Sequence, residues 1–207
     1  MHVWDKWAKC YERLWVQNWV LTPSRLAIRD HVRRVCPRAG RVLDVGCGIG
    51  QLARELADDE PGREIVALDT SAGMIERAES MTDADGRITY AQSSLADLDG
   101  ESFDLIVSTN ALPYIPDQMG ALRKMRALLR PGGRALVLHA NANRFYDRFV
   151  LTIVKATVGR AHYLPSDVLE EYMRQAGFAP VAVLRVPMHR LAPSVHMVEG
   201  LTRMALG

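Results

Sequence analysis

Three glycines at alternating positions, Gly46, Gly48 and Gly50, follow a short apolar run in the first third of the chain. Glycine has no Cβ, so a loop of this kind lets a ligand come close to the backbone. Asp44 lies in the apolar run just before the loop, and Asp69 ends the next apolar run. A helix that begins after such a loop directs its first N–H groups at the ligand. The pattern predicts a nucleotide-like ligand between the loop and two carboxylates.

The spacing of the glycines argues against a dinucleotide. A dinucleotide-binding loop reads G-x-G-x-x-G, whereas this loop reads G-x-G-x-G and continues with Gln51. The carboxylate of Asp44 would repel a diphosphate but can receive an ammonium group, directly or through water. Asp69 can accept hydrogen bonds from both hydroxyls of a ribose. Together these features describe a nucleoside that carries an amino acid, and S-adenosylmethionine is such a molecule.

Strand-like and helical patterns alternate through the middle of the chain, which predicts a parallel sheet covered by helices. Continuous Val, Ile and Leu runs are typical of strands buried on both faces. Strands are expected over 41–45, 64–69, 88–92, 103–108 and 134–139, and helices over 51–58, 71–80, 117–129 and 165–176. Two further strands, over 178–186 and 195–204, are expected to form an antiparallel hairpin at the edge. The predicted fold is α/β, with a Rossmann-like, mostly parallel sheet of seven strands.

The two flanks of this unit are basic and carry most of the aromatic side chains. Residues 1–38 are predicted to form an N-terminal helical cap, interrupted at Thr22-Pro23, and residues 39–207 the ligand-binding domain, with a helical insertion at about 141–164. Aromatic residues spaced by three and four along the first helix form one face, namely Trp4, Trp7, Tyr11, Trp15 and Trp19. This face is either a lid over the ligand or ordinary helix packing. The insertion carries Phe145 and Phe149 beside arginines, which allows packing, a cover for a lipophilic substrate, or peripheral contact with a membrane.

Four segments of the chain resemble the class I S-adenosylmethionine-dependent methyltransferases, in the family's order. The resemblance covers residues 41–140 well and extends weakly to the C-terminus. The segments are VLDVGCGIG at 42–50, ALDTSAGMI at 67–75, FDLIVSTNALPYIPD at 103–117 and LLRPGGRALVL at 128–138. The resemblance implies an enzyme that uses S-adenosylmethionine, with S-adenosylhomocysteine as its product.

The resemblance also implies a set of cofactor-binding residues. The loop glycines would line the methionine and ribose portion, Asp44 would anchor the amino group indirectly, and Asp69 would hold the ribose diol. Thr70 and Met74 would flank the adenine. Ser94 stands where many relatives have an acid that binds the adenine amino group, and a serine accepts that bond less strongly. The full expected set is Asp44, Gly46, Cys47, Gly48, Gly50, Asp69, Thr70, Met74, Ser93, Ser94, Leu95 and Asn110.

The methyl acceptor is expected to be a small, apolar or aromatic metabolite, because both candidate covers are apolar and aromatic. Oxygen, carbon and nitrogen remain open as the acceptor atom. Three residues are candidates for catalytic roles: His139 as a general base at the end of a strand, Tyr114 after the fourth strand, and Tyr11 by resemblance. A catalytically silent S-adenosylmethionine-binding scaffold and, less well supported, a nicotinamide-dependent oxidoreductase are the alternatives.

The composition excludes several other classes of protein. The 207 residues include 48% hydrophobic and 24% charged side chains, an ordinary globular profile. The three cysteines form no CxxC pair, and no acidic cluster has metal-ligand spacing, so no bound metal is expected. The tetrapeptide typical of amino-methylases of nucleic-acid bases is missing, as is a basic patch interleaved with aromatics, so no nucleic acid is expected as partner. Neither a signal peptide nor a membrane-spanning run is visible, and the expected location is the cytoplasm.

Overall fold

The computed structural model describes residues 3–8, 17–82, 86–100, 102–158 and 161–204, without the side chains of a few helical residues. The helices are α1 (Val3–Ala8), the π-helical turn η2 (Gln17–Leu21), α2 (Thr22–Val35), α3 (Gln51–Asp59), α4 (Ala72–Ser80), α5 (Gln118–Leu128), α6 (Phe145–Val158) and α7 (Ser166–Gln175), with short 3₁₀ turns η3 (Leu95–Asp97) and η4 (Leu112–Tyr114). The strands are β1 (Arg41–Val45), β2 (Glu64–Asp69), β3 (Ile88–Gln92), β4 (Phe103–Thr109), β5 (Leu129–Ala140), β6 (Val181–Val186) and β7 (Val195–Leu201).

The seven strands form one sheet in the order β3-β2-β1-β4-β5-β7-β6. β1 to β5 are parallel to one another, and β7 is antiparallel to both β5 and β6. The predicted fold class and the edge hairpin are therefore confirmed. The strand order reverses between β1 and β4, and in sheets of this kind the carboxyl ends at that point form a ligand crevice.

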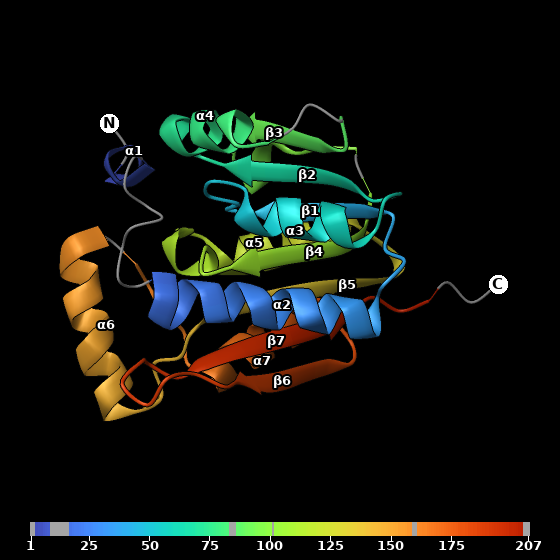
Figure 1. Ribbon diagram of the computed structural model, residues 1–207. Helices are drawn as coiled ribbons and strands as arrows, with labels where there is room; N and C mark the ends of the chain where they lie inside the picture. The colour runs from blue at the N-terminus through green and yellow to red at the C-terminus, as the bar shows by residue number, and fades with distance from the viewer. Residues whose placement is uncertain (1–2, 9–16, 83–85, 101, 159–160, 205–207) are drawn as a thin grey trace.

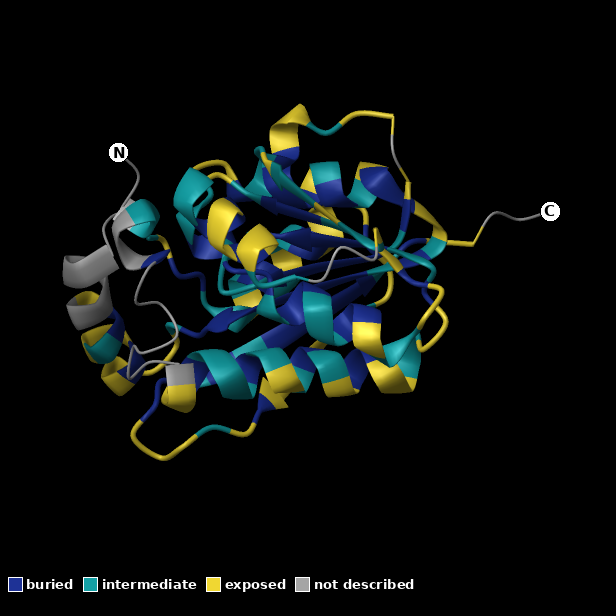
Figure 2. Ribbon diagram, turned by 45° about the horizontal axis from the view of Figure 1, so that its top comes forward, coloured by how far each residue is buried: buried dark blue, intermediate teal, exposed yellow. Residues whose placement is uncertain are grey.

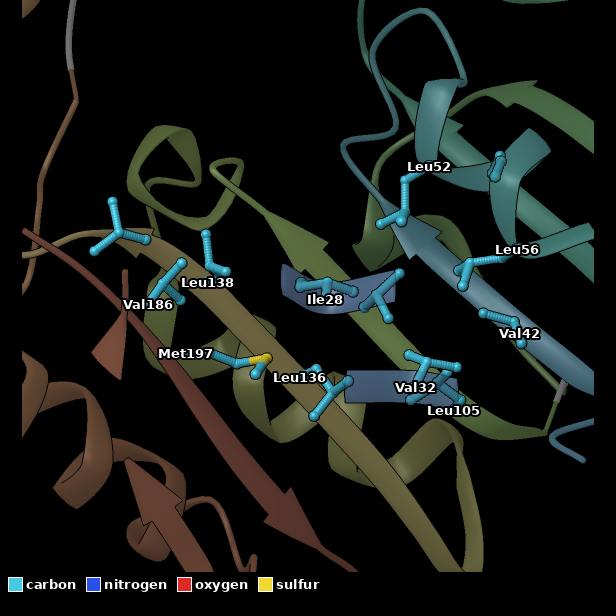
Figure 3. Close-up of a cluster of buried hydrophobic side chains, with 14 of the residues drawn as sticks. Ile28, Val32, Val42, Leu52, Leu56, Leu105, Leu136, Leu138, Val186 and Met197 are labelled. Carbon is cyan, nitrogen blue, oxygen red and sulfur yellow. The ribbon is translucent and has the colours of Figure 1, made fainter. Parts of the chain in front are cut away.

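Helices cover the sheet on both faces, and each face has its own core. On one face α2 and α3 cover the sheet and run along the strands (Figure 1). Ile28 and Val32 of α2 pack there with Val42 and Leu105 of the sheet (Figure 3). On the other face α5 and α7 pack through fully buried residues such as Leu122 and Met173. The division into a cap over 1–38 and a domain over 39–207 stays a prediction. α2, which lies within 1–38, shares a core with the sheet of the predicted domain.

Most strand and helix limits agree with the sequence prediction to within a few residues. Two limits, those of β5 and β7 inside the sheet, differ because of local hydrogen bonding. β5 begins at Leu129 instead of 134, since Pro131-Gly132-Gly133 is accommodated by a register shift opposite Phe103. β7 ends at Leu201 instead of 204, because Thr202 turns its N–H and hydroxyl toward the carbonyls of Gly133 and Arg130.

The N-terminal helices also differ from the predicted interruption at Thr22-Pro23. α2 begins at Thr22, directly after η2, and Pro23 lies in its first turn. Proline is tolerated there because the first N–H groups of a helix have no intrahelical partner. Among the residues that the structure describes, no helix is both long and apolar enough to cross a membrane.

Candidate active site

A cavity of about 1040 Å³ lies at the carboxyl ends of the parallel strands. Its walls include the ends of β1, β2, β4 and β5, the loops after them, and parts of α1, η2, α5 and α6. Sites for small molecules usually measure about 300–1,000 Å³. The cavity therefore has room for a nucleoside-sized ligand together with a second small molecule.

The glycine loop forms one wall of this cavity. Gly46, Gly48 and Gly50 all have φ between +56° and +73°, a region that residues with a Cβ seldom adopt. A Cβ on Gly50 would overlap the ring of Tyr90, so this glycine serves the packing of the loop. A Cβ on Gly48 would meet nothing within 4 Å, and Gly48 lines the cavity. Gly48 is thus the glycine whose missing side chain leaves room for a ligand.

Asp69 is fixed beside the loop by two backbone groups. Its Oδ2 accepts a hydrogen bond from the N–H of Gly48 at 2.9 Å, and its Oδ1 accepts one from the N–H of Ser71 at 2.9 Å. Asp69 lines the cavity, as do Thr70 and Met74 that follow it. Ser71 caps α4 and holds Met74 in place, since its hydroxyl accepts the N–H of Met74. The local chain therefore presents a preoriented carboxylate and an apolar methionine to one ligand.

Asp44 lies behind the loop and is buried, with 2% of its surface exposed. Its Oδ2 has no hydrogen-bond partner among the described residues. Burial, and then the negative charge of Asp69, raise the pKa of Asp44 from 3.8 to about 7. A buried carboxylate in this state gains a partner when a cation arrives nearby, which fits the ammonium group of S-adenosylmethionine.

Two polar side chains at the end of β4, those of Thr109 and Asn110, also line the cavity. Neither Thr109 Oγ1 nor Asn110 Nδ2 has a hydrogen-bond partner in the described part of the chain, although both are buried. Asn110 adopts a φ of 58°, and its own N–H donates to the carbonyl of Leu138 at 2.6 Å. Buried polar groups are costly unless they bind something. Both atoms fit contacts with a polar ligand.

The segment after β3 forms the third wall, through Ser93, Ser94 and Leu95. The hydroxyl of Ser94 donates to Asp97 Oδ2 at 2.6 Å, and this bond lowers the pKa of Asp97. Ser94 and Asp97 form a capping box, in which the Ser94 hydroxyl oxygen also accepts the N–H of Asp97, so one lone pair of this oxygen remains as an acceptor. A serine oriented in this way can receive an amino group, the role that the resemblance gives to an acid at this position.

The structure brings nine of the twelve expected cofactor-binding residues to the cavity: Gly46, Gly48, Asp69, Thr70, Met74, Ser93, Ser94, Leu95 and Asn110. The other three, Asp44, Cys47 and Gly50, belong to the same loop but are not part of the lining. The pKa of the Cys47 thiol is raised well above its ordinary value by burial and by the charges of Asp44 and Asp69. This thiol stays protonated and has no nucleophilic character at neutral pH.

The opposite end of the cavity is apolar and aromatic. The hydroxyls of Tyr114 and Tyr163 lie 3.1 Å apart, and Trp4 packs edge-on against Tyr114 with ring centroids 5.1 Å apart. Burial raises the pKa of the Tyr163 hydroxyl. The lining at this end comes from helices and strand ends far apart in the sequence: Trp4, Val20, Leu21, Tyr114, Ala140, Val150, Leu151, Tyr163 and Pro193.

Of the candidate catalytic residues that the structure describes, Tyr114 lines the cavity and His139 does not. The structure does not bring His139 to the cavity, because its neighbour Ala140 takes the cavity side and the two residues face opposite ways along β5. His139 is buried beside His196, its Nδ1 donates to the carbonyl of Ala140 at 2.8 Å, and burial lowers its pKa to about 4. Tyr11 lies outside the described residues, as do Trp15 and the side chain of Trp7.

Sequence reasoning missed the contact that fixes α1 over the site. Asp5 Oδ1 accepts hydrogen bonds from the Ser71 hydroxyl at 2.5 Å and from the N–H of Gly73 at 3.3 Å. Ala8 packs with Ile49 and Met74 in a small core. An acidic residue at the start of another helix is stabilising, but nothing in the sequence indicated which helix Asp5 would meet.

Comparison with known proteins gives a consistent result. Residues 42–133 match the family model described as a methyltransferase domain. The chain is 30% identical over 194 residues to a ubiquinone biosynthesis O-methyltransferase of Xanthomonas axonopodis, covering 84% of this chain and 78% of that protein. It is 33% identical over 145 residues to a ubiquinone/menaquinone biosynthesis C-methyltransferase of Syntrophotalea carbinolica, covering 63% and 61%.

The fold also matches a solved structure over nearly all of its length. A methyltransferase of Thermotoga maritima, described as a possible histamine N-methyltransferase, aligns with a TM-score of 0.77 and covers 97% of this chain and 99% of its own. The two sequences are 19% identical. This similarity concerns the arrangement of the sheet and helices.

Proposed function

The chain belongs to the class I S-adenosylmethionine-dependent methyltransferases, and from this membership we propose that its acceptor is a small aromatic metabolite with apolar substituents. That it is an enzyme of this family, acting on a small molecule with S-adenosylmethionine as cofactor, rests on the relatives and the family model. The comparisons support neither the silent scaffold nor the nicotinamide-dependent oxidoreductase. The class of acceptor is the open question.

The observation that carries the proposal is the division of the cavity into two ends. One end has the glycine loop, Asp69 and Asn110, which suit the polar cofactor. The other end has three aromatic rings, Trp4, Tyr114 and Tyr163, beside aliphatic side chains. Aromatic rings pack edge-on or offset against another aromatic ring. The two relatives named above act in quinone biosynthesis by their names, at an oxygen in one case and at a carbon in the other.

S-adenosylmethionine, when bound, supplies a methyl group activated by a sulfonium. The chain's own residues would hold and orient the reactants. Asp69 binds the ribose hydroxyls with a carboxylate already fixed by two N–H groups, and Asp44 balances the ammonium charge. The hydroxyls of Tyr114 and Tyr163 orient a polar substituent of the acceptor, and the apolar wall excludes water. Alignment of this kind contributes most of the rate enhancement when no strong base is needed.

A panel of acceptors tests the proposal. The purified protein is incubated with S-adenosylmethionine and each acceptor, and S-adenosylhomocysteine is measured. Hydroxylated aromatic rings with alkyl tails are expected to turn over, whereas aliphatic amines and phosphorylated amino alcohols of similar size are not. The Asp69→Ala variant serves as the control for cofactor-dependent product. Turnover confined to the polar, non-aromatic acceptors would overturn the proposed class.

A further inference from the structure

Two phenylalanines on α6 extend into solvent one helical turn apart. Phe145 is 87% exposed and Phe149 is 59% exposed. Leu191, in the loop between β6 and β7, is also exposed, and its carbonyl accepts a hydrogen bond from the Tyr146 hydroxyl at 2.8 Å. α6 stands at the end of the molecule toward which the parallel strands point (Figure 1), and exposed residues run along its described part (Figure 2). Neighbouring exposed apolar side chains with a polar border mark interaction sites.

The same surface is basic. Arg144 directly precedes α6, Arg148 lies on it between the phenylalanines, and Arg190 lies beside Leu191; all three are exposed. Asp147 is the one acidic residue in the insertion at 141–164. It is buried, and it accepts hydrogen bonds from the N–H and the hydroxyl of Ser194 at 2.9 and 2.5 Å. The acid therefore faces inward, where it fixes the loop to α6, and the described part of α6 has no exposed acid.

The inner face of α6 belongs to the cavity. Val150 and Leu151 line the acceptor end, and Pro193 of the adjoining loop lines it as well. One helix thus carries apolar side chains toward the solvent and toward the acceptor site. A lipophilic molecule that leaves a bilayer at this surface would meet the apolar end of the cavity first.

We propose that α6 and the loop after β6 form a docking surface for an anionic lipid bilayer. The α6 surface is defined by Arg144, Phe145, Arg148, Phe149, Arg190 and Leu191. Large apolar side chains inserted at the headgroup level, bordered by arginines, are the composition of helices that lie in a membrane interface. The arginines complement anionic headgroups. That the bilayer also delivers the acceptor rests on the proposed function, whereas the docking itself does not.

Vesicle binding by the full chain tests the docking. The protein is mixed with vesicles of phosphatidylcholine alone or with phosphatidylglycerol, and the bound fraction is measured by flotation. Binding is expected only with the anionic lipid and is expected to fall as salt is added. Arg144→Gln with Arg148→Gln should weaken it about 25-fold at low salt, since each basic residue near the surface contributes about fivefold. Phe145→Ser with Phe149→Ser should weaken it on the order of tenfold or more, with little dependence on salt.

Matched variants elsewhere on the surface provide the controls. Arg38→Gln with Arg123→Gln removes the same charge from exposed positions before β1 and on α5, and Met204→Ser removes an exposed apolar side chain near the C-terminus. Both controls should bind vesicles like the wild type. All variants should bind S-adenosylhomocysteine unchanged, which shows that they are folded.

Three results would overturn the docking surface. They are no binding to anionic vesicles, equal losses in the α6 variants and the controls, and a mass in solution that shows the phenylalanines joining two copies of the chain. The delivery of the acceptor has its own test, because Phe145→Ser with Phe149→Ser should slow methyl transfer to a vesicle-embedded acceptor but not to a water-soluble one. Vesicle binding without turnover of any aromatic acceptor would keep the docking surface and refute the proposed function.

Discussion

The ionisation of Asp44 should make cofactor binding depend on pH. Asp44 is buried, has an unpartnered Oδ2 among the described residues, and has a pKa near 7 instead of 3.8. The difference corresponds to about 4 kcal/mol against ionisation in the free protein. An ammonium group nearby favours the carboxylate and lowers this pKa. Binding of S-adenosylhomocysteine, which has the same amino acid portion, should therefore release a proton below pH 7.

The expected magnitude follows from the fraction of Asp44 that is ionised before binding. With a free-state pKa of about 7 and a bound-state pKa below 5, the affinity should fall roughly twentyfold between pH 7.5 and 5.5. Titration calorimetry in buffers of different ionisation enthalpy measures both the affinity and the proton release. An Asp44→Asn variant should lose the pH dependence, while Asp58→Asn, an exposed acid of α3, should keep it.

A ligand that lacks the amino acid portion separates Asp44 from other titrating groups. Methylthioadenosine should bind the wild-type protein with the same affinity at pH 5.5 and 7.5. A twentyfold change for this ligand as well, or an unchanged pH dependence in Asp44→Asn, would refute the assignment of the ammonium group to Asp44.

The raised pKa of Asp44 also predicts how the stability of the ligand-free protein depends on pH. A folded-state pKa above the unfolded value means that the native state binds the extra proton between pH 4 and 7. The contribution of protonated Asp44 is complete below pH 4 and is lost as the pH rises to about 7, with a total of about 4 kcal/mol. As the pH rises from 4 to 7, the unfolding free energy of the wild type should therefore fall relative to that of Asp44→Asn.

Three further predictions concern the rest of the site. Asp69→Ala should weaken S-adenosylhomocysteine binding by about 1.5–3 kcal/mol in calorimetry, because a charged hydrogen-bond partner is lost; unchanged affinity would contradict its role. Gly48→Ala should weaken the same binding at least tenfold, and Gly50→Ala should lower the melting temperature more than Gly48→Ala does, since both glycines have positive φ but only the Cβ at position 50 meets a ring. Removal of residues 1–20 should reduce turnover more than cofactor affinity, and equal turnover by the soluble truncated protein would show that this segment is no lid.

The parts of the site that could be predicted are those in which one segment supplies both position and chemistry. The loop at 46–50 follows a strand and precedes a helix, so its place at the end of the sheet is fixed locally. The same holds for Asp69 at the end of β2 and Asn110 after β4. Each of these residues follows the carboxyl end of a strand or lies at it, and the carboxyl ends of parallel strands all meet at one edge of the sheet.

The acceptor end could be predicted only in part: Tyr114 was expected there, but the end as a whole is assembled from segments that share no local pattern. The Tyr163 hydroxyl, for example, meets that of Tyr114 across 49 positions of the chain. His139 was expected at the site, but a strand alternates its side chains, and a shift of one residue decides which of two neighbours faces the cavity. Ala140 has that place. The residue types were therefore enough to identify the ligand-binding loop. Which side chain of β5 lines the cavity depends on the register of that strand, which the sequence does not show.

The position of α1 couples the two ends of the cavity. Asp5 is bonded to Ser71 and Gly73 at the start of α4, next to the Met74 that lines the cofactor end. One residue before it, Trp4 packs on Tyr114 at the acceptor end. A change that frees Asp5 would therefore move an aromatic wall of the acceptor site without touching it. Asp5→Asn should raise the KM for the acceptor more than the Kd for S-adenosylhomocysteine, and a larger effect on the cofactor would show that α1 serves the cofactor end alone.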